Sequence, residues 1–156
     1  MNILIKAIIL SMLPISELRG GIPFAYFSGI GIIKSFVFCI LANALATPIT
    51  FFFMDYLHNH LVKIKAYKNF FNRHLDKARK KFEKSAGTKW AFWALAFFVG
   101  IPLPMTGAYT GTLLAWFFKM ERKKAYLSVF TGIIMAGIIV SIIVFSGSAF
   151  WRFLIK

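Results

Sequence analysis

The chain has 156 residues and a net charge of +14, and 59% of its residues are hydrophobic, with a mean hydropathy of +0.72. This composition excludes a soluble domain with a polar surface and indicates one membrane domain over residues 1–156. The basic residues lie between apolar runs, so they indicate membrane topology rather than nucleic-acid binding. A single cysteine, Cys39, excludes an intrachain disulfide.

The first apolar segment, Ile3–Ile33, is interrupted by the run Pro14–Pro23, which holds a carboxylate, a guanidinium and two glycines. Neither flank reaches the roughly 20 residues that a spanning helix needs. Proline removes a backbone donor and glycine loosens the backbone, so we expect the helix to break here. Irregular backbone at membrane depth must contact protein or line a wet cavity. We therefore predict a membrane hairpin whose polar tip is the working site.

The second apolar segment, Ser35–Tyr56, is long enough to span the membrane once. It is followed by residues 57–89, which contain ten lysines and arginines and apolar residues at three- and four-residue steps. This pattern predicts an amphipathic helix on the cytoplasmic side that ends near Gly87. The helix either lies on an anionic membrane surface or packs on the protein or a second subunit, and both alternatives remain open.

The third segment, Trp90–Phe118, is broken at Pro102–Gly111, and the fourth, Ala125–Leu154, is again long enough to span. The short link Lys119–Lys124 is basic, so we expect it to be cytoplasmic like residues 57–89. Both ends of the third segment then lie on one side, which predicts that this segment re-enters. The alternative is a four-span bundle in which the first and third helices are kinked.

An internal repeat relates the two halves at an offset of 90 residues. Leu13-Pro14 aligns with Leu103-Pro104, and Ala25-Tyr26-Phe27 aligns with Ala115-Trp116-Phe117. Each half, about 3–56 and about 90–154, is a broken segment followed by a spanning helix. The predicted fold is an all-α integral membrane protein with two inverted repeats. Each repeat is a re-entrant broken-helix hairpin followed by a transmembrane helix, and the two tips meet near the midplane.

The first tip carries the charged candidates for a substrate or coupling site. Arg19, with backbone N–H groups at Gly20 and Gly21 and a helix N-terminus near Ile22, would form an anion site. Glu17 would then be a proton-coupling or cation-pairing group. In the alternative interpretation, Glu17 and Arg19 form an ion pair that only holds the shape of the hairpin.

The second tip is uncharged. It offers glycine backbone that a ligand can approach, at Gly107, and a set of hydroxyls: Thr106, Tyr109, Thr110 and Thr112. The alternative is that these hydroxyls bond back to helix carbonyls. Asn43 is the next polar group inside the membrane, and we expect it to bond hairpin backbone more readily than a ligand.

No pattern for catalysis or metal binding is present in the sequence. His58 and His60 flank Asn59, but a metal site needs more ligands than this spacing offers. There is no glycine-rich nucleotide loop, nucleophile elbow or pair of catalytic carboxylates. We therefore expect neither an enzyme nor a bound cofactor or metal.

Two motifs resemble a known family: Met12-Leu13-Pro14-Ile15-Ser16-Glu17-Leu18-Arg19-Gly20-Gly21-Ile22-Pro23 and Phe98-Val99-Gly100-Ile101-Pro102-Leu103-Pro104-Met105-Thr106-Gly107-Ala108-Tyr109-Thr110-Gly111. They look like the signatures of the putative small multidrug export protein family, which is similar in plan to DedA-like membrane proteins with two facing hairpins. The resemblance covers both hairpins and the helices that follow them.

The family resemblance implies a multi-pass transporter of the plasma membrane that exports a small amphipathic compound. The DedA likeness implies instead a translocase of an anionic lipid carrier such as a polyprenyl phosphate. A membrane scaffold without transport is a third possibility. The expected partners are membrane lipids, anionic lipids among them, the substrate and a second copy of the chain in a homodimer, but no nucleic acid.

Overall fold

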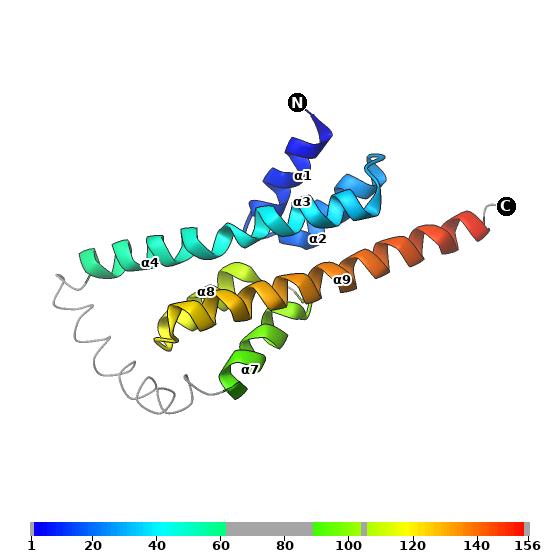
Figure 1. The fold of residues 1–156 in the computed structure, drawn as a ribbon. Coiled ribbons are helices and arrows are strands. Elements are labelled where there is room, and N and C mark those ends of the chain that lie inside the picture. Colours follow the sequence, from blue (N-terminus) through cyan, green and yellow to red (C-terminus); the bar gives the residue numbers. More distant parts are fainter. Residues whose placement is uncertain (1, 62–88, 104–105, 155–156) are drawn as a thin grey trace.

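The computed structural model describes residues 2–61, 89–103 and 106–154, and within these ranges the chain forms helices and no strand (Figure 1). The predicted all-helical architecture is therefore confirmed for the described part. Most of the predicted basic amphipathic helix lies in residues 62–88, outside the described residues.

Two long helical paths run along the molecule. One consists of α3 (Ile32–Ala44) and α4 (Ala46–Leu61), and the other is the single helix α9 (Arg122–Leu154). In Figure 1 they lie alongside each other and run in opposite directions. Both Ile32–His58 and Arg122–Ser148 are long and apolar enough to cross a membrane.

The first long path is interrupted at Leu45, whose backbone N–H turns back to the Ala42 carbonyl at 3.3 Å. The cause lies three residues further on, because Pro48 has no N–H to donate to the carbonyl of Ala44. Since α9 contains no proline, it remains one helix over 33 residues.

The first broken segment consists of α1 (Ile3–Met12) and α2 (Glu17–Phe27). The break is narrower than the predicted Pro14–Pro23, because α2 already begins at Glu17 and continues through Pro23. Pro14 cannot donate to the Leu10 carbonyl, which accepts instead from the Leu13 N–H and from the Ser16 hydroxyl. The two glycines are thus helical, and the expected helix start near Ile22 was wrong.

The second broken segment consists of α7 (Lys89–Gly100) and α8 (Ala108–Phe117). Here too the break is shorter than predicted, since Gly111 is already helical. The Thr106 hydroxyl lies 2.7 Å from the Ile101 carbonyl and 2.9 Å from the Leu103 carbonyl. This hydroxyl stabilises the turn between the two helices by bonding carbonyls of the turn itself.

The broken segments pack across the halves, since α2 contacts α9 and α8 contacts α4. Matching positions are buried at the offset of 90 residues. Ile22 and Thr112 are fully enclosed, and Ala25 and Ala115 are 0% and 2% exposed. Both α2 and α8 therefore bury the same face. The re-entrant hairpins and the inverted relation of the repeats stay predictions.

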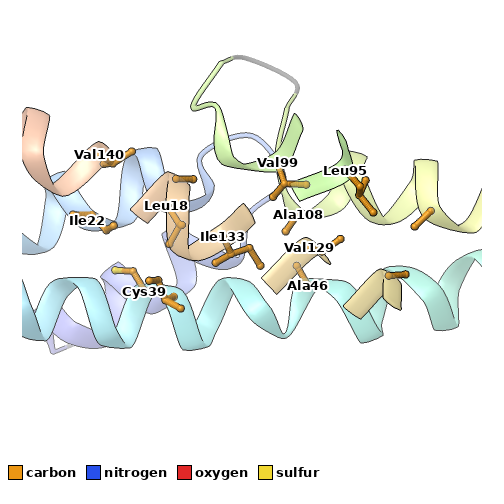
Figure 2. Packing of buried hydrophobic residues seen from close by; sticks show 14 of the residues in the cluster. Leu18, Ile22, Cys39, Ala46, Leu95, Val99, Ala108, Val129, Ile133 and Val140 are labelled. Atoms are coloured by element: carbon orange, nitrogen blue, oxygen red, sulfur yellow. The ribbon is translucent and has the colours of Figure 1, made fainter. Parts of the chain in front are cut away.

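Small residues allow close packing in the core, where Leu18, Val99 and Ile133 gather between the helices (Figure 2). A Cβ at Gly132 would lie only 2.6 Å from both the Ala96 carbonyl oxygen and the Val99 Cβ, so α9 needs glycine there to contact α7. Small residues at helix contacts are typical of membrane proteins.

Large apolar side chains point away from the protein over much of its surface. Ile15 is 96% exposed, Trp90 is 84% exposed, and Ile33 and Phe52 are each 76% exposed. Soluble monomers rarely expose contiguous apolar surface on this scale. Together with the two long apolar helices, this surface indicates a chain that faces lipid.

Candidate functional site

The two breaks face each other in the structure. The Arg19 guanidinium of α2 donates to the Thr106 carbonyl and lies 3.3 Å from the Thr106 hydroxyl. In the reverse direction, the Tyr109 hydroxyl of α8 donates to the Met12 carbonyl at the end of α1. Both bonds satisfy carbonyls that the helix breaks leave open. The structure thus contains the contact between the two tips that the repeat led us to expect.

Glu17 lies at the N-terminus of α8, in the other half of the chain. Its Oε1 accepts from the Tyr109 backbone N–H at 3.5 Å. The unpaired N–H groups and the dipole of a helix N-terminus favour a negative charge. Glu17 is 7% exposed, so an acidic residue of the first half caps a helix of the second half from a buried position.

Gly107 makes this contact sterically possible. A Cβ added to Gly107 would collide with both carboxylate oxygens of Glu17. The φ angle of Gly107 is −178°, an extended conformation open to any residue, so its role is to leave space. Gly107 was predicted to let a ligand approach the backbone closely. In the structure, the Glu17 side chain makes that close approach.

The backbone of Glu17 is strained. Its φ angle is +45°, in the left-handed region that residues other than glycine adopt at a cost of about 1–3 kcal/mol. Because Glu17 is the first residue of α2, this conformation sets the direction in which the helix leaves the break. Such strain persists only where surrounding contacts hold it, and here the N-terminus of α8 supplies them.

Asn43 reaches the same carboxylate from α3. The residue is 2% exposed, and its Oδ1 has no hydrogen-bond partner. Asn43 thus lies beside a side chain of the site, and its predicted bond to hairpin backbone stays a prediction. Asn43, Glu17 and Thr106 line a cavity of about 10 Å³, which is about the volume that one water molecule needs.

A larger cavity of about 550 Å³ lies beside these groups. Its lining combines charged, hydroxyl-bearing and apolar residues from both broken segments: Pro14, Ile15, Glu17, Arg19, Thr106, Gly107, Tyr109, Thr110 and Leu113. The volume is within the range of small-molecule sites, about 300–1,000 Å³.

Three of the predicted site residues do not line this cavity: Asn43, which lines only the small one, Gly20 and Gly21. Gly20 donates its N–H to the Ser16 carbonyl at 3.0 Å, so that group is already used inside the helix. Gly21 packs against Ser11 and Ala7 of α1. The expected anion site on the backbone of these two glycines is therefore not formed, and the helix N-terminus at the site is that of α8.

His58 and His60 lie in the last turn of α4 and contact protein groups there. His60 Nδ1 lies 2.9 Å from the Tyr56 carbonyl, and the His58 ring packs 5.2 Å from the Trp116 ring. Within the described ranges, no group of three or more histidine, cysteine, aspartate or glutamate residues could hold a metal ion.

The sequence reasoning missed a second polar contact between the halves. Asp55 of α4 accepts hydrogen bonds from Arg122 of α9 and from Trp116 of α8. An acidic residue near the end of a spanning helix was the available signal, but its partners lie more than 60 residues away and follow no local pattern.

A helical chain with two membrane-length apolar helices and a polar cavity between two broken segments has the construction of a membrane transporter. The chain belongs to the family described as putative small multi-drug export protein, which it matches over residues 17–139. The predicted family is thereby confirmed, and its name is that of an exporter. Comparison with curated proteins and with solved structures found no match.

Proposed function

We propose that this protein transports a small amphipathic compound across the plasma membrane and that the compound binds in the cavity of about 550 Å³. The observation that carries this proposal is the position of the cavity between the two broken segments, with both charged and apolar residues in its lining. Transporters commonly bind substrate where discontinuous helices of two repeats meet.

Arg19 is the charged group that a bound compound would contact first. Glu17 is 7% exposed and is held at the N-terminus of α8, whereas the Arg19 side chain is half-buried and lines the cavity. A guanidinium carries five N–H donors in a planar arrangement, and the carbonyl and hydroxyl of Thr106 occupy only part of them. An acidic or hydrogen-bond-accepting group on the substrate suits this position.

We further propose that the two broken segments re-enter the membrane. Support comes from the order of contacts along α9, where the Ser128 hydroxyl donates to the Phe92 carbonyl and Gly100 packs against Met135. Helix α7 thus advances along α9 toward the centre of the molecule. Helix α8 then returns, because its last turn contacts Asp55 through Trp116.

Re-entry of the third segment can be tested by sidedness. Single cysteines at Lys89 and at Lys119, introduced on a Cys39→Ser background, should react with a membrane-impermeant maleimide from the same side of the membrane. Labelling from opposite sides would show that the segment spans and would contradict the proposed topology.

Transport should depend on Arg19. We expect Arg19→Ala to abolish uptake of a fluorescent amphipathic compound by proteoliposomes while the size-exclusion profile stays monodisperse. Arg19→Lys should retain part of the activity, because an ammonium keeps the charge but loses the planar two-pronged geometry.

The double variant Glu17→Gln/Arg19→Gln separates a binding role from a structural one. If the two charges only stabilise each other, removing both should restore folding and transport, because neither is left uncompensated at depth. A well-folded, active double variant would falsify the binding role of Arg19.

A second candidate function is translocation of an anionic lipid carrier such as a polyprenyl phosphate. The exposure of Arg19 and the burial of Glu17 favour it, since a phosphate pairs well with a guanidinium. Parallel assays with a cationic dye, an anionic dye and a labelled polyprenyl phosphate distinguish the two functions. If the folded protein transports none of these compounds, a membrane scaffold without transport is the remaining interpretation.

A further inference from the structure

The two halves are joined at both ends of the molecule, on either side of the central cavity. At the basic end, where Lys119 and the start of α9 lie, Asp55 of α4 joins Trp116 of α8 and Arg122 of α9. At the opposite end, Tyr26 of α2 joins Ser148 of α9. Figure 1 shows that these ends lie far apart along α9.

The contact at the basic end is charged and has several parts. Arg122 Nη2 donates to both carboxylate oxygens of Asp55, at 2.9 Å and 2.6 Å, and Trp116 Nε1 donates to the same carboxylate at 2.8 Å. The guanidinium also lies 4.2 Å from the ring centroid of Phe51. The side chains of the ion pair are 48% and 45% exposed, and exposed pairs of this kind are weak enough to open and close.

The contact at the opposite end is a single bond. The hydroxyls of Tyr26 and Ser148 lie 2.9 Å apart. A cavity of about 680 Å³ adjoins this bond, lined by Tyr26, Ser148 and the turn at Gly29–Gly31, and a cavity of about 510 Å³ adjoins the contact at the basic end.

The internal repeat relates the two contacts. Tyr26 and Trp116 are equivalent at the offset of 90 residues, and so are His58 and Ser148. The Trp116 ring packs against the His58 ring, and the Tyr26 hydroxyl forms a hydrogen bond with the Ser148 hydroxyl. In each case the last turn of a broken segment contacts the far end of the long helix from the other half.

We propose that these contacts are the two gates of the transport cavity, and that they open in alternation. The contact of Asp55 with Trp116 and Arg122 closes the basic end, and the contact of Tyr26 with Ser148 closes the opposite end. The proposal rests on the transport function proposed above. Since the basic end is held by an ion pair, an indole hydrogen bond and a cation–π contact, whereas the opposite end has a single hydroxyl bond, the opposite end opens more often in the resting protein.

The test measures access to the cavity and needs no substrate. A reporter cysteine, Thr110→Cys, is placed in the cavity wall on a Cys39→Ser background, and a membrane-impermeant maleimide is added from either side of oriented vesicles. We expect Asp55→Asn to raise the labelling rate from the basic end by about fivefold, the change that follows from losing a half-exposed ion pair. Ser148→Ala should raise the rate from the opposite end.

The matched control is Glu121→Gln, which also removes one negative charge at the basic end. It breaks the ion pair between Glu121 and Lys124, which lies within the second half and does not connect the two halves. Its labelling rate should equal that of the parent. The charge reversal Asp55→Arg/Arg122→Asp restores an ion pair, so it should bring the rate at least halfway back.

Equal labelling of Asp55→Asn and Glu121→Gln would overturn the gate proposal, as would a reversed pair that labels as fast as Asp55→Asn. Because labelling is independent of substrate, gates can be demonstrated even if the proposed amphipathic compound is not carried. Conversely, transport that depends on Arg19 can hold while the gate variants leave labelling unchanged.

Discussion

The two broken segments share a backbone plan but differ in the chemistry they bring to the centre. Both α2 and α8 end in the same hydrogen-bonded turn. The Ile30 N–H bonds to the Ala25 carbonyl at 3.0 Å in the first half, and the Met120 N–H bonds to the Ala115 carbonyl at 2.9 Å in the second. These bonds lie 90 residues apart, so the repeat extends to single hydrogen bonds.

The central positions differ where their backbone matches. Glu17 is equivalent to Gly107, and the two residues are in contact. In the predicted inverted repeat, residues that are equivalent in the two halves would touch near the axis that relates the halves. Two large side chains cannot occupy that place, so one half carries the carboxylate and the other carries none. The site therefore depends on a difference between the two halves, which is a carboxylate at residue 17 and none at residue 107.

The largest expected effect comes from filling the space that this asymmetry leaves. Gly107→Ala would drive a methyl group into the Glu17 carboxylate, which is fixed by the N–H groups of α8. Overpacking of this kind costs about 1–3 kcal/mol. We expect a clear fall in the thermal unfolding temperature in detergent and loss of transport.

Gly31→Ala is the matched control, because a Cβ there would meet no atom within 4 Å and Gly31 has a negative φ angle. It should leave both stability and transport near those of the parent. An equal loss in the two variants would show that general helix or loop propensity, and not the contact with Glu17, causes the effect.

How much of this was predictable from sequence differs between elements. The helices were predictable, since uninterrupted apolar runs of membrane length have few other stable forms. The breaks were placed too broadly, because Pro23 is tolerated within α2 and both Gly20 and Gly21 are helical there. Pattern alone does not reveal which proline ends a helix and which is accommodated.

The site was predictable as a set of residues but not as a set of bonds. Glu17, Arg19 and Thr106 were expected to lie together at the two tips, and they line one small cavity, while their position at the membrane midplane stays a prediction. That Glu17 caps α8 depends on how two segments 90 residues apart are oriented, which no local pattern contains. The contact of Asp55 with Arg122 was missed for the same reason.

A second prediction exchanges the two equivalent positions. Gly107→Glu alone would place two carboxylates against each other, so we expect aggregation or a strongly lowered unfolding temperature. Adding Glu17→Gly should recover much of the folded fraction, because one carboxylate remains and residue 17, with its φ of +45°, becomes a glycine. The readout is the monodisperse fraction on size exclusion, compared with both single variants.

Recovery in the exchanged protein would support an axis close to residues 17 and 107. If the double variant aggregates as much as Gly107→Glu, the two positions are in contact without being interchangeable. The comparison between the halves would then hold for the helix ends but not for the site.

The smallest expected effect concerns the turns that end α2 and α8. Both turns require a left-handed residue, which is Gly29 with a φ of +91° in the first half and Lys119 with a φ of +52° in the second. Glycine adopts this conformation without the cost of about 1–2 kcal/mol that other residues incur. Lys119→Gly should therefore stabilise the protein slightly, by about 0.5–1 kcal/mol after the greater flexibility of the unfolded chain is counted. Gly29→Ala should destabilise it by a similar amount, since a Cβ there would meet no atom within 4 Å and only the backbone conformation is penalised.

The control is Lys119→Ala, which separates the contributions of side chain and backbone at residue 119, because it removes the lysine side chain but keeps the strained backbone. If Lys119→Ala and Lys119→Gly give the same unfolding temperature, backbone strain does not distinguish the two turns, and the lysine must be retained for its side chain.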